Sequence, residues 1–201
     1  MKICTGLPSA VGEALAKTCK IKAMAIGVPM AVALVDAVGG LQIFSRMDGT
    51  LPASTELSVS KAYTAAVFRM PTHDLGRQAQ PGAALYGVER SHNGRIVLFG
   101  GGFPFCLRGV VVGAVGVSGG SVDQDMQVAQ QAVLLLGQME AWMEKIVGLV
   151  CADSLDPREA SQVTDDLQRK ILSRMDSSAA AAAIPAVIGG LALAFACGAA
   201  Q

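Results

Sequence analysis

The stretch that decides the fold is residues 100–120, GGGFPFCLRGVVVGAVGVSGG, which holds eight of the chain's 23 glycines. Glycine adopts backbone angles that a side chain forbids, so these glycines predict sharp turns around extended segments. The β-branched and aromatic residues between them predict strands at 103–107 and 110–117, joined by a turn at Arg108-Gly109. Pro104 restricts the first strand to a sheet edge or a bulge. The apolar run of the second strand is typical of burial on both faces.

Segments upstream supply partners for these two strands. RIVLF at 95–99 and MAVALVD at 30–36 are apolar and predict strands. In LQIFSRM at 41–47, Leu41 and Ile43 alternate with Gln42, which predicts a half-exposed strand. Gly39-Gly40 turns the chain just before it.

Four further segments carry helical patterns that would cover such a sheet. They are 9–25, 54–70, 72–79 and 123–147. In the last segment apolar residues recur at intervals of three and four, which is typical of an amphipathic helix. Ser121 and Gln124 have capping-box spacing at its start.

The composition changes after this long helix, where we expect a boundary between a domain at 1–148 and a helical extension at 149–201. The extension contains an amphipathic helix at 157–175 and an alanine-rich apolar helix at 179–199. Alanine contributes little to membrane insertion, so contact with protein is favoured over a membrane anchor. Residues 156–201 would then target a shell or pack an oligomer.

The composition argues against several classes of function. The chain has 16 basic and 16 acidic residues and a formal net charge of zero, so it predicts no basic surface for nucleic acid. Its 5 cysteines are scattered without a C-x-x-C pair, which favours a reducing compartment over a disulfide framework or a zinc site. Gly6, Pro8 and Glu13 interrupt any apolar core of a signal peptide, so we expect a cytoplasmic protein.

A series of motifs resembles a known family. In chain order the motifs are VALVDAVGG (32–40), SRMDGT (45–50), SKAYTAA (60–66), PGAALYG (81–87), NGRIVLFGGGFPF (93–105) and GVVVGAVGVSGGSVDQD (109–125). They resemble the GlcG/HbpS family, and most of all its branch formed by the C-terminal domain of PduO. The order of several motifs is far more specific than any one of them.

The resemblance implies an α/β (α+β) chain with a profilin-like fold, in which helices cover both faces of a five-stranded antiparallel sheet. It also implies a homo-oligomer, a dimer or an octamer, that binds haem. The PduO branch further implies a propanediol-utilising bacterial microcompartment and its cobalamin chemistry. The corrinoid-adenosylating domain of PduO has no counterpart among these motifs. The family's haem ligand is a histidine near the N-terminus, whereas the first histidine here is His73.

Polar residues within the matched motifs are the candidates for binding a cofactor. Lys61 and Thr64 lie three apart on one helix face and could reach a carboxylate or a haem propionate. Alternatively, Lys61 pairs with Asp36 or Asp48 and fixes the helix to the hairpin. Arg46 and Asp48 either complete the rim of a pocket or simply make a turn.

The two histidines are the candidates for binding iron. His73 follows Thr72 at a predicted helix start, and His92 lies in a polar loop. Either imidazole could ligate iron, as could Met47 or a cysteine. The candidate set for cofactor binding is therefore Lys61, Thr64, Arg46, Asp48, Thr72 and His73, with His73 and His92 as candidate metal ligands. The chain has no C-x-x-C-H motif for covalent haem attachment.

A catalytic set is not evident in the sequence. Gly116 to Gly120 fits the nucleophile-elbow pattern G-x-S-x-G around Ser118, but both histidines precede Ser118, whereas the hydrolase order requires one after it. Asp123 and Asp125 are interpreted as favourable charges in the first turn of a helix.

We therefore expect a non-catalytic haem- or corrinoid-binding or sensing protein that works as a homo-oligomer, and the PduO branch places it in a microcompartment. One alternative is an enzyme that acts on a small oxidised carboxylic acid with Lys61 and Asp48 as acid, base or binding groups. The other is a structural assembly module.

Overall fold

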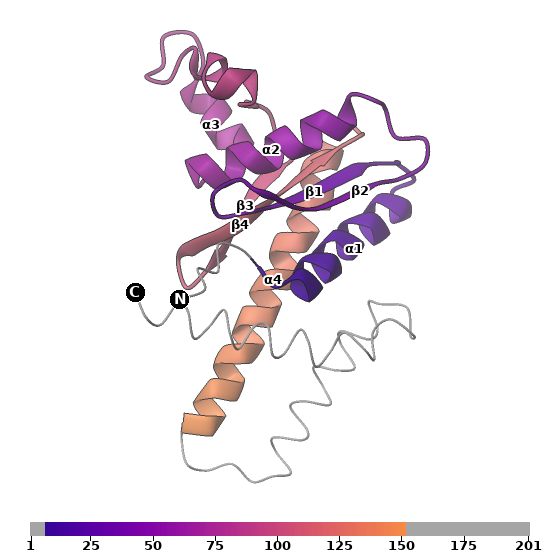
Figure 1. The fold of residues 1–201 in the computed structure, drawn as a ribbon, viewed down its shortest axis with the longest axis vertical. Coiled ribbons are helices and arrows are strands. Elements are labelled where there is room, and N and C mark those ends of the chain that lie inside the picture. The colour runs from indigo at the N-terminus through magenta and orange to yellow at the C-terminus, as the bar shows by residue number, and fades with distance from the viewer. Residues whose placement is uncertain (1–6, 152–201) are drawn as a thin grey trace.

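The structure is a computed structural model that describes residues 7–151 (Figure 1). Its strands are β1 (Ala31–Asp36), β2 (Leu41–Arg46), β3 (Gly102–Leu107) and β4 (Val110–Ser118). They form one antiparallel sheet in the order β2-β1-β4-β3. Its helices are α1 (Ser9–Ala25), α2 (Ser54–Phe68), α3 (Thr72–Gln78) and α4 (Val122–Cys151), with short 3₁₀ turns η1 (Val88–Arg90) and η2 (His92–Gly94). The four helices predicted within 7–151 and four of the predicted strands are thus confirmed.

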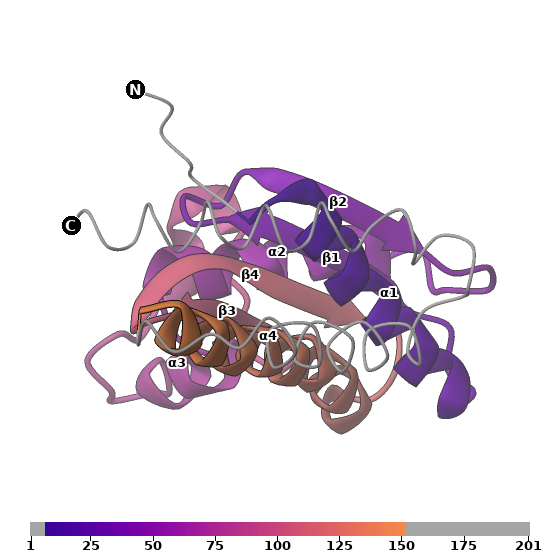
Figure 2. The same ribbon diagram turned by 90° about the horizontal axis from the view of Figure 1, so that it is seen from below.

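Helices cover both faces of the sheet, with α2 on one face and α1 and α4 on the other (Figures 1 and 2). Successive strand residues point to opposite faces, and the two faces carry side chains of different size. Large residues such as Leu34, Phe105 and Val115 pack in the core beneath α1 and α4. Alanines from β1, β4 and α2 meet on the other face.

Small residues let α2 lie very close to the sheet. A Cβ atom at Gly116 would lie 2.0 Å from the Ser58 carbonyl oxygen of α2, so no side chain fits at this position. A Cβ atom at Gly102 would lie 2.5 Å from the Lys61 carbonyl oxygen. The glycines of the 100–120 stretch therefore set the distance between the sheet and α2.

The prediction of a strand at 95–99 is wrong, and the described residues form a sheet of four strands rather than five. The Val97 amide donates to Thr64 Oγ1 in α2 at 3.0 Å, so this backbone donor is taken by a side chain and not by a strand. The Leu98 carbonyl lies against Gly76 in α3, where a Cβ atom would come within 1.9 Å of its oxygen. The segment is therefore a loop that joins α2, α3 and β3.

Two other strand predictions are tested by the sheet. Pro104 lies in β3, which is an edge strand as predicted. Burial of β4 on both faces is confirmed only from Gly113 onward, because Val110 is exposed and the next two residues are half-buried.

The long helix α4 begins with the predicted capping box. The Gln124 amide donates to Ser121 Oγ at 3.3 Å, and the Ser121 amide donates to Gln124 Oε1 at 2.9 Å. The helix continues to Cys151, across the expected boundary at 148, and its C-terminal half projects beyond the sheet (Figure 1). The predicted helices at 157–175 and 179–199 lie outside the described residues. Of the helices searched within 7–151, none is long and apolar enough to cross a membrane.

Candidate functional site

Lys61 lies in α2 and is completely buried. Its Nζ donates to Asp125 Oδ2 at 2.7 Å and to the Val117 carbonyl at 3.0 Å. The same ammonium lies 4.7 Å from the centre of the Phe99 ring. A residue from α2 is thus joined to the end of β4, the start of α4 and the loop before β3.

Asp125, the partner of Lys61, is almost as deeply buried, and its other oxygen accepts from the Gly120 amide at 3.0 Å. Burial raises the pKa of Asp125 and lowers the pKa of Lys61, because an apolar environment disfavours both charges. A Cβ atom at Gly101 would lie 2.8 Å from Lys61 Nζ, so the glycine loop closes directly over the pair. We call this pair the Lys61–Asp125 clasp.

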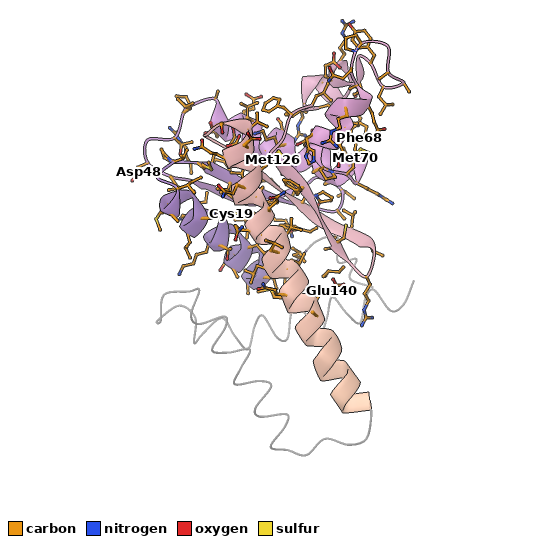
Figure 3. The ribbon with its side chains drawn as sticks, turned by 180° about the vertical axis from the view of Figure 1, so that it is seen from behind. Cys19, Asp48, Phe68, Met70, Met126 and Glu140 are labelled. Carbon is orange, nitrogen blue, oxygen red and sulfur yellow. The ribbon has the colours of Figure 1, made fainter. Side chains whose placement is uncertain are left out.

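The clasp differs from both sequence expectations for Lys61. The lysine does not pair with Asp36 or Asp48. Asp36 instead accepts from the Val38 and Gly40 amides of its own turn, at 3.0 and 2.7 Å. Asp125 is more than a first-turn charge, since its carboxylate holds a buried ammonium. Lys61 is enclosed whereas Asp48 is exposed, so the two side chains form no acid/base pair. Figure 3 shows Asp48 on the opposite side of the molecule from Phe68, the last residue of α2.

Thr64 and Thr72 are buried and hold the loop above the clasp. Thr64 Oγ1 accepts from the Val97 amide at 3.0 Å and donates to the Ser60 carbonyl at 2.8 Å. Thr72 Oγ1 accepts from the Gly102 amide at 3.1 Å. The hydroxyls of both predicted binding residues are thus occupied by backbone groups.

Arg46 and Asp48 belong to the turn between β2 and α2. Arg46 Nη2 donates to the Thr50 carbonyl at 3.1 Å, and both side chains are exposed. This geometry favours the turn alternative for these two residues. Ser118 is buried at the end of β4, opposite Ala31.

The two histidines differ in which ring nitrogen is accessible. His73 Nε2 lies 3.5 Å from Asp74 Oδ1, and its Nδ1 is buried and has no hydrogen-bond partner within residues 7–151. Its ring lies 5.6 Å from that of Phe103, centre to centre. The free nitrogen of His73 is therefore enclosed by protein.

His92 is exposed and hydrogen-bonded to the serine before it. The Ser91 hydroxyl donates its one proton to the Val88 carbonyl at 2.7 Å. The same hydroxyl oxygen lies 2.9 Å from His92 Nδ1, and the direction of this bond depends on the tautomer of the ring. In the tautomer with its hydrogen on Nδ1, His92 has its lone pair on Nε2, the form in which an imidazole binds a metal.

Aromatic rings and a cation surround His92. Its ring centre lies 5.9 Å from that of Tyr63 and 6.1 Å from that of Phe68. The Arg95 guanidinium lies over Tyr63, 4.0 Å from the ring centre. We call Tyr63, Phe68, His92 and Arg95 the His92 corner. Within 7–151, no three His, Cys, Asp or Glu side chains gather as a metal cluster.

Sequence reasoning missed parts of both sites. Asp125 and Phe99 of the clasp come from segments far from Lys61 in sequence, and Phe68 and Arg95 of the corner were not singled out. Arg95 could have been placed near His92 from the sequence, because it directly follows the polar turn His92-Asn93-Gly94. No sequence signal joins Lys61 to Asp125.

Comparisons with known proteins agree with this architecture. The chain is 44% identical over 124 residues to a 15.0 kDa protein encoded between dhaT and dhaS in Citrobacter freundii, covering 62% of this chain and 87% of that protein. It is 45% identical over 112 residues to the corrinoid adenosyltransferase PduO of Salmonella typhimurium, covering 56% of this chain but only 33% of PduO.

A solved structure and a family model extend the comparison. The crystal structure of the PduOC:heme complex matches with a TM-score of 0.60 and 41% identity, over 62% of this chain and 90% of that one. The model of the haem degrading protein HbpS-like family matches residues 7–134. Because that match spans well over half of the sequence, the chain belongs to the HbpS-like family.

Proposed function

We propose that this chain is a non-catalytic haem-binding protein that works as a homo-oligomer. The observation that carries the proposal is the 41% identity to a domain crystallised with haem, over 90% of that domain. The His92 corner supports it, because haem binding needs an apolar or aromatic surface and an accessible iron ligand. Bound haem would supply redox or ligand-sensing chemistry, and the chain's own residues would bind and orient it.

Similarity to PduO supports a setting in the cytoplasm, inside a propanediol-type bacterial microcompartment. PduO is a corrinoid adenosyltransferase, so cobalamin is the second ligand that we consider. Shell proteins are the partners proposed for residues 156–201, and a dimer or an octamer is the proposed assembly. The profilin-like arrangement expected from the family stays part of this proposal.

The enzyme alternative has less support. An acid/base role for Lys61 requires that its ammonium reach a substrate, but it is fully buried and bonded to Asp125 and Val117. Its expected partner Asp48 lies in an exposed turn. We therefore interpret Lys61 as a structural residue.

Titration of the purified full chain with haemin tests the proposal. We expect saturable growth of a shifted Soret band, and retention of the pigment on size-exclusion chromatography in an oligomer peak. Titration with cobalamin under the same conditions measures the second ligand. A chain that leaves the haemin spectrum unchanged contradicts haem binding, and retention of cobalamin alone would replace haem with a corrinoid.

A further inference from the structure

We propose that His92 is the chain's own ligand to haem iron and that Arg95 holds a haem carboxylate. This inference rests on the proposed function, and it assigns the site to the His92 corner. His92 is exposed, and its Nδ1 is hydrogen-bonded to Ser91 Oγ at 2.9 Å. Its Nε2 has no hydrogen-bond partner among the described residues, so this nitrogen is open to a metal, and the bond to Ser91 orients the ring.

The backbone around His92 is left-handed. His92 has φ of 53° and Asn93 has φ of 57°, and Gly94 continues the left-handed turn at 76°. Consecutive left-handed residues with side chains are uncommon, because the side chain crowds the backbone in this conformation. The imidazole that this turn carries lies beside the rings of Tyr63 and Phe68.

Aromatic rings and a guanidinium lie beside His92. Tyr63 and Phe68 offer aromatic faces beside the imidazole, and Tyr63 holds the Arg95 guanidinium by a cation–π contact. Within the described residues Arg95 has no ion pair with a carboxylate. A planar ligand with an iron atom at its centre and carboxylates at its edge matches an imidazole, aromatic walls and a free guanidinium.

The charge of the surrounding segment agrees with an anionic ligand. Residues 69–95 contain four arginines against one aspartate and one glutamate, a formal charge of +2 in a chain whose net charge is zero. This segment contains α3, η1 and η2 and lies at the end of the molecule opposite the projecting half of α4 (Figure 1). It would attract the haem carboxylates.

The test compares His92→Gly with Asn93→Gly in the full chain by haemin titration. Glycine accepts a positive φ, so both variants keep the turn and only His92→Gly loses the imidazole. We expect His92→Gly to weaken haemin binding at least about tenfold and to change the Soret position. Added imidazole should restore the original spectrum. Asn93→Gly and His73→Ala should bind as the wild type does.

Arg95→Gln provides a second readout, with Arg77→Gln as its control. Loss of one exposed charge-assisted contact should weaken haemin binding by about threefold to fivefold without moving the Soret band. If the wild type binds haemin and His92→Gly binds it equally with the same spectrum, the assignment to His92 is wrong while the proposed function stands. If the wild type fails to bind, the proposed function itself fails.

Discussion

The Lys61–Asp125 clasp and the His92 corner both combine charge with aromatic rings, yet they differ in what surrounds them. In the clasp the ammonium and the carboxylate are enclosed, and each is hydrogen-bonded to protein. In the His92 corner the imidazole is exposed, one nitrogen is fixed by Ser91, and the other has no partner among the described residues. Buried charges with complete partners hold the fold together, whereas exposed groups with a free position can receive a ligand.

The difference shows that residue type alone does not separate structure from function. Lys61 and Thr64 have the chemistry of carboxylate-binding residues, and the fold uses both to fix the loop before β3. His92 lies in a loop that resembles many solvent-exposed turns, and its surroundings make it a candidate ligand.

The largest expected effect comes from removing one half of the clasp. Lys61→Met leaves the Asp125 carboxylate buried without its cation, so we expect a loss of about 3–5 kcal/mol in the free energy of unfolding. Urea denaturation measures it, with Glu56→Gln on the exposed side of α2 as the control. The double variant Lys61→Met/Asp125→Leu should lose much less than the two single changes together. Additive losses would contradict a direct pairing.

A smaller effect should follow from crowding the loop over the clasp. A Cβ atom at Gly101, where φ is 113°, would lie 2.7 Å from the Val117 carbonyl and 2.8 Å from Lys61 Nζ. We expect Gly101→Ala to cost about 2–4 kcal/mol. Gly109 also has a positive φ but open space around it, so Gly109→Ala should cost only about 1 kcal/mol. Equal losses in thermal unfolding would show that the close contacts do not matter.

The hydroxyl of Thr64 should contribute less to the free energy of unfolding than the clasp or the absence of a side chain at Gly101. Thr64→Val keeps the shape of the side chain but leaves the buried Val97 amide without its acceptor, which costs about 1–3 kcal/mol. The rate of hydrogen exchange at the Val97 amide should rise in this variant. Protection of that amide at the wild-type level would mean that another group accepts its hydrogen.

Lys61 should give the free energy of unfolding a small pH dependence. Its sign is opposite to that expected for a lysine in an exposed ion pair. Because burial lowers the pKa of Lys61, the unfolded chain binds more protons than the folded chain below the ordinary lysine value of 10.5. Stability from this group therefore rises with pH in that window. The gap in urea midpoint between the wild type and Lys61→Met should widen as the pH rises toward 10.5. A gap that narrows would mean that Asp125 raises the pKa of Lys61 instead.

Sequence reasoning predicted the parts of the fold that depend on local signals. The capping box of Ser121 and Gln124, the edge position of Pro104 and the bounds of α1 follow from neighbouring residues, and the structure has them. The strand predicted at 95–99 failed because its amide at Val97 bonds a threonine far earlier in the chain. An apolar run of five residues does not show where its backbone partners lie.

The clasp was beyond prediction for the same reason. Lys61 and Asp125 are 64 residues apart, and only the folded sheet brings α2 and the start of α4 together. For the His92 corner the sequence pointed to the histidine, but its contacts with Ser91, Tyr63 and Phe68 depend on the fold. Local patterns find elements, whereas the state of a side chain depends on its neighbours in space.

Haemin titration of Lys61→Met/Asp125→Leu alongside His92→Gly tests the contrast between the two regions most directly. If the clasp is structural and the corner binds the ligand, the folded double variant binds haemin with the wild-type Soret band and His92→Gly does not. Loss of haemin binding in the folded double variant, together with wild-type binding by His92→Gly, would contradict the account.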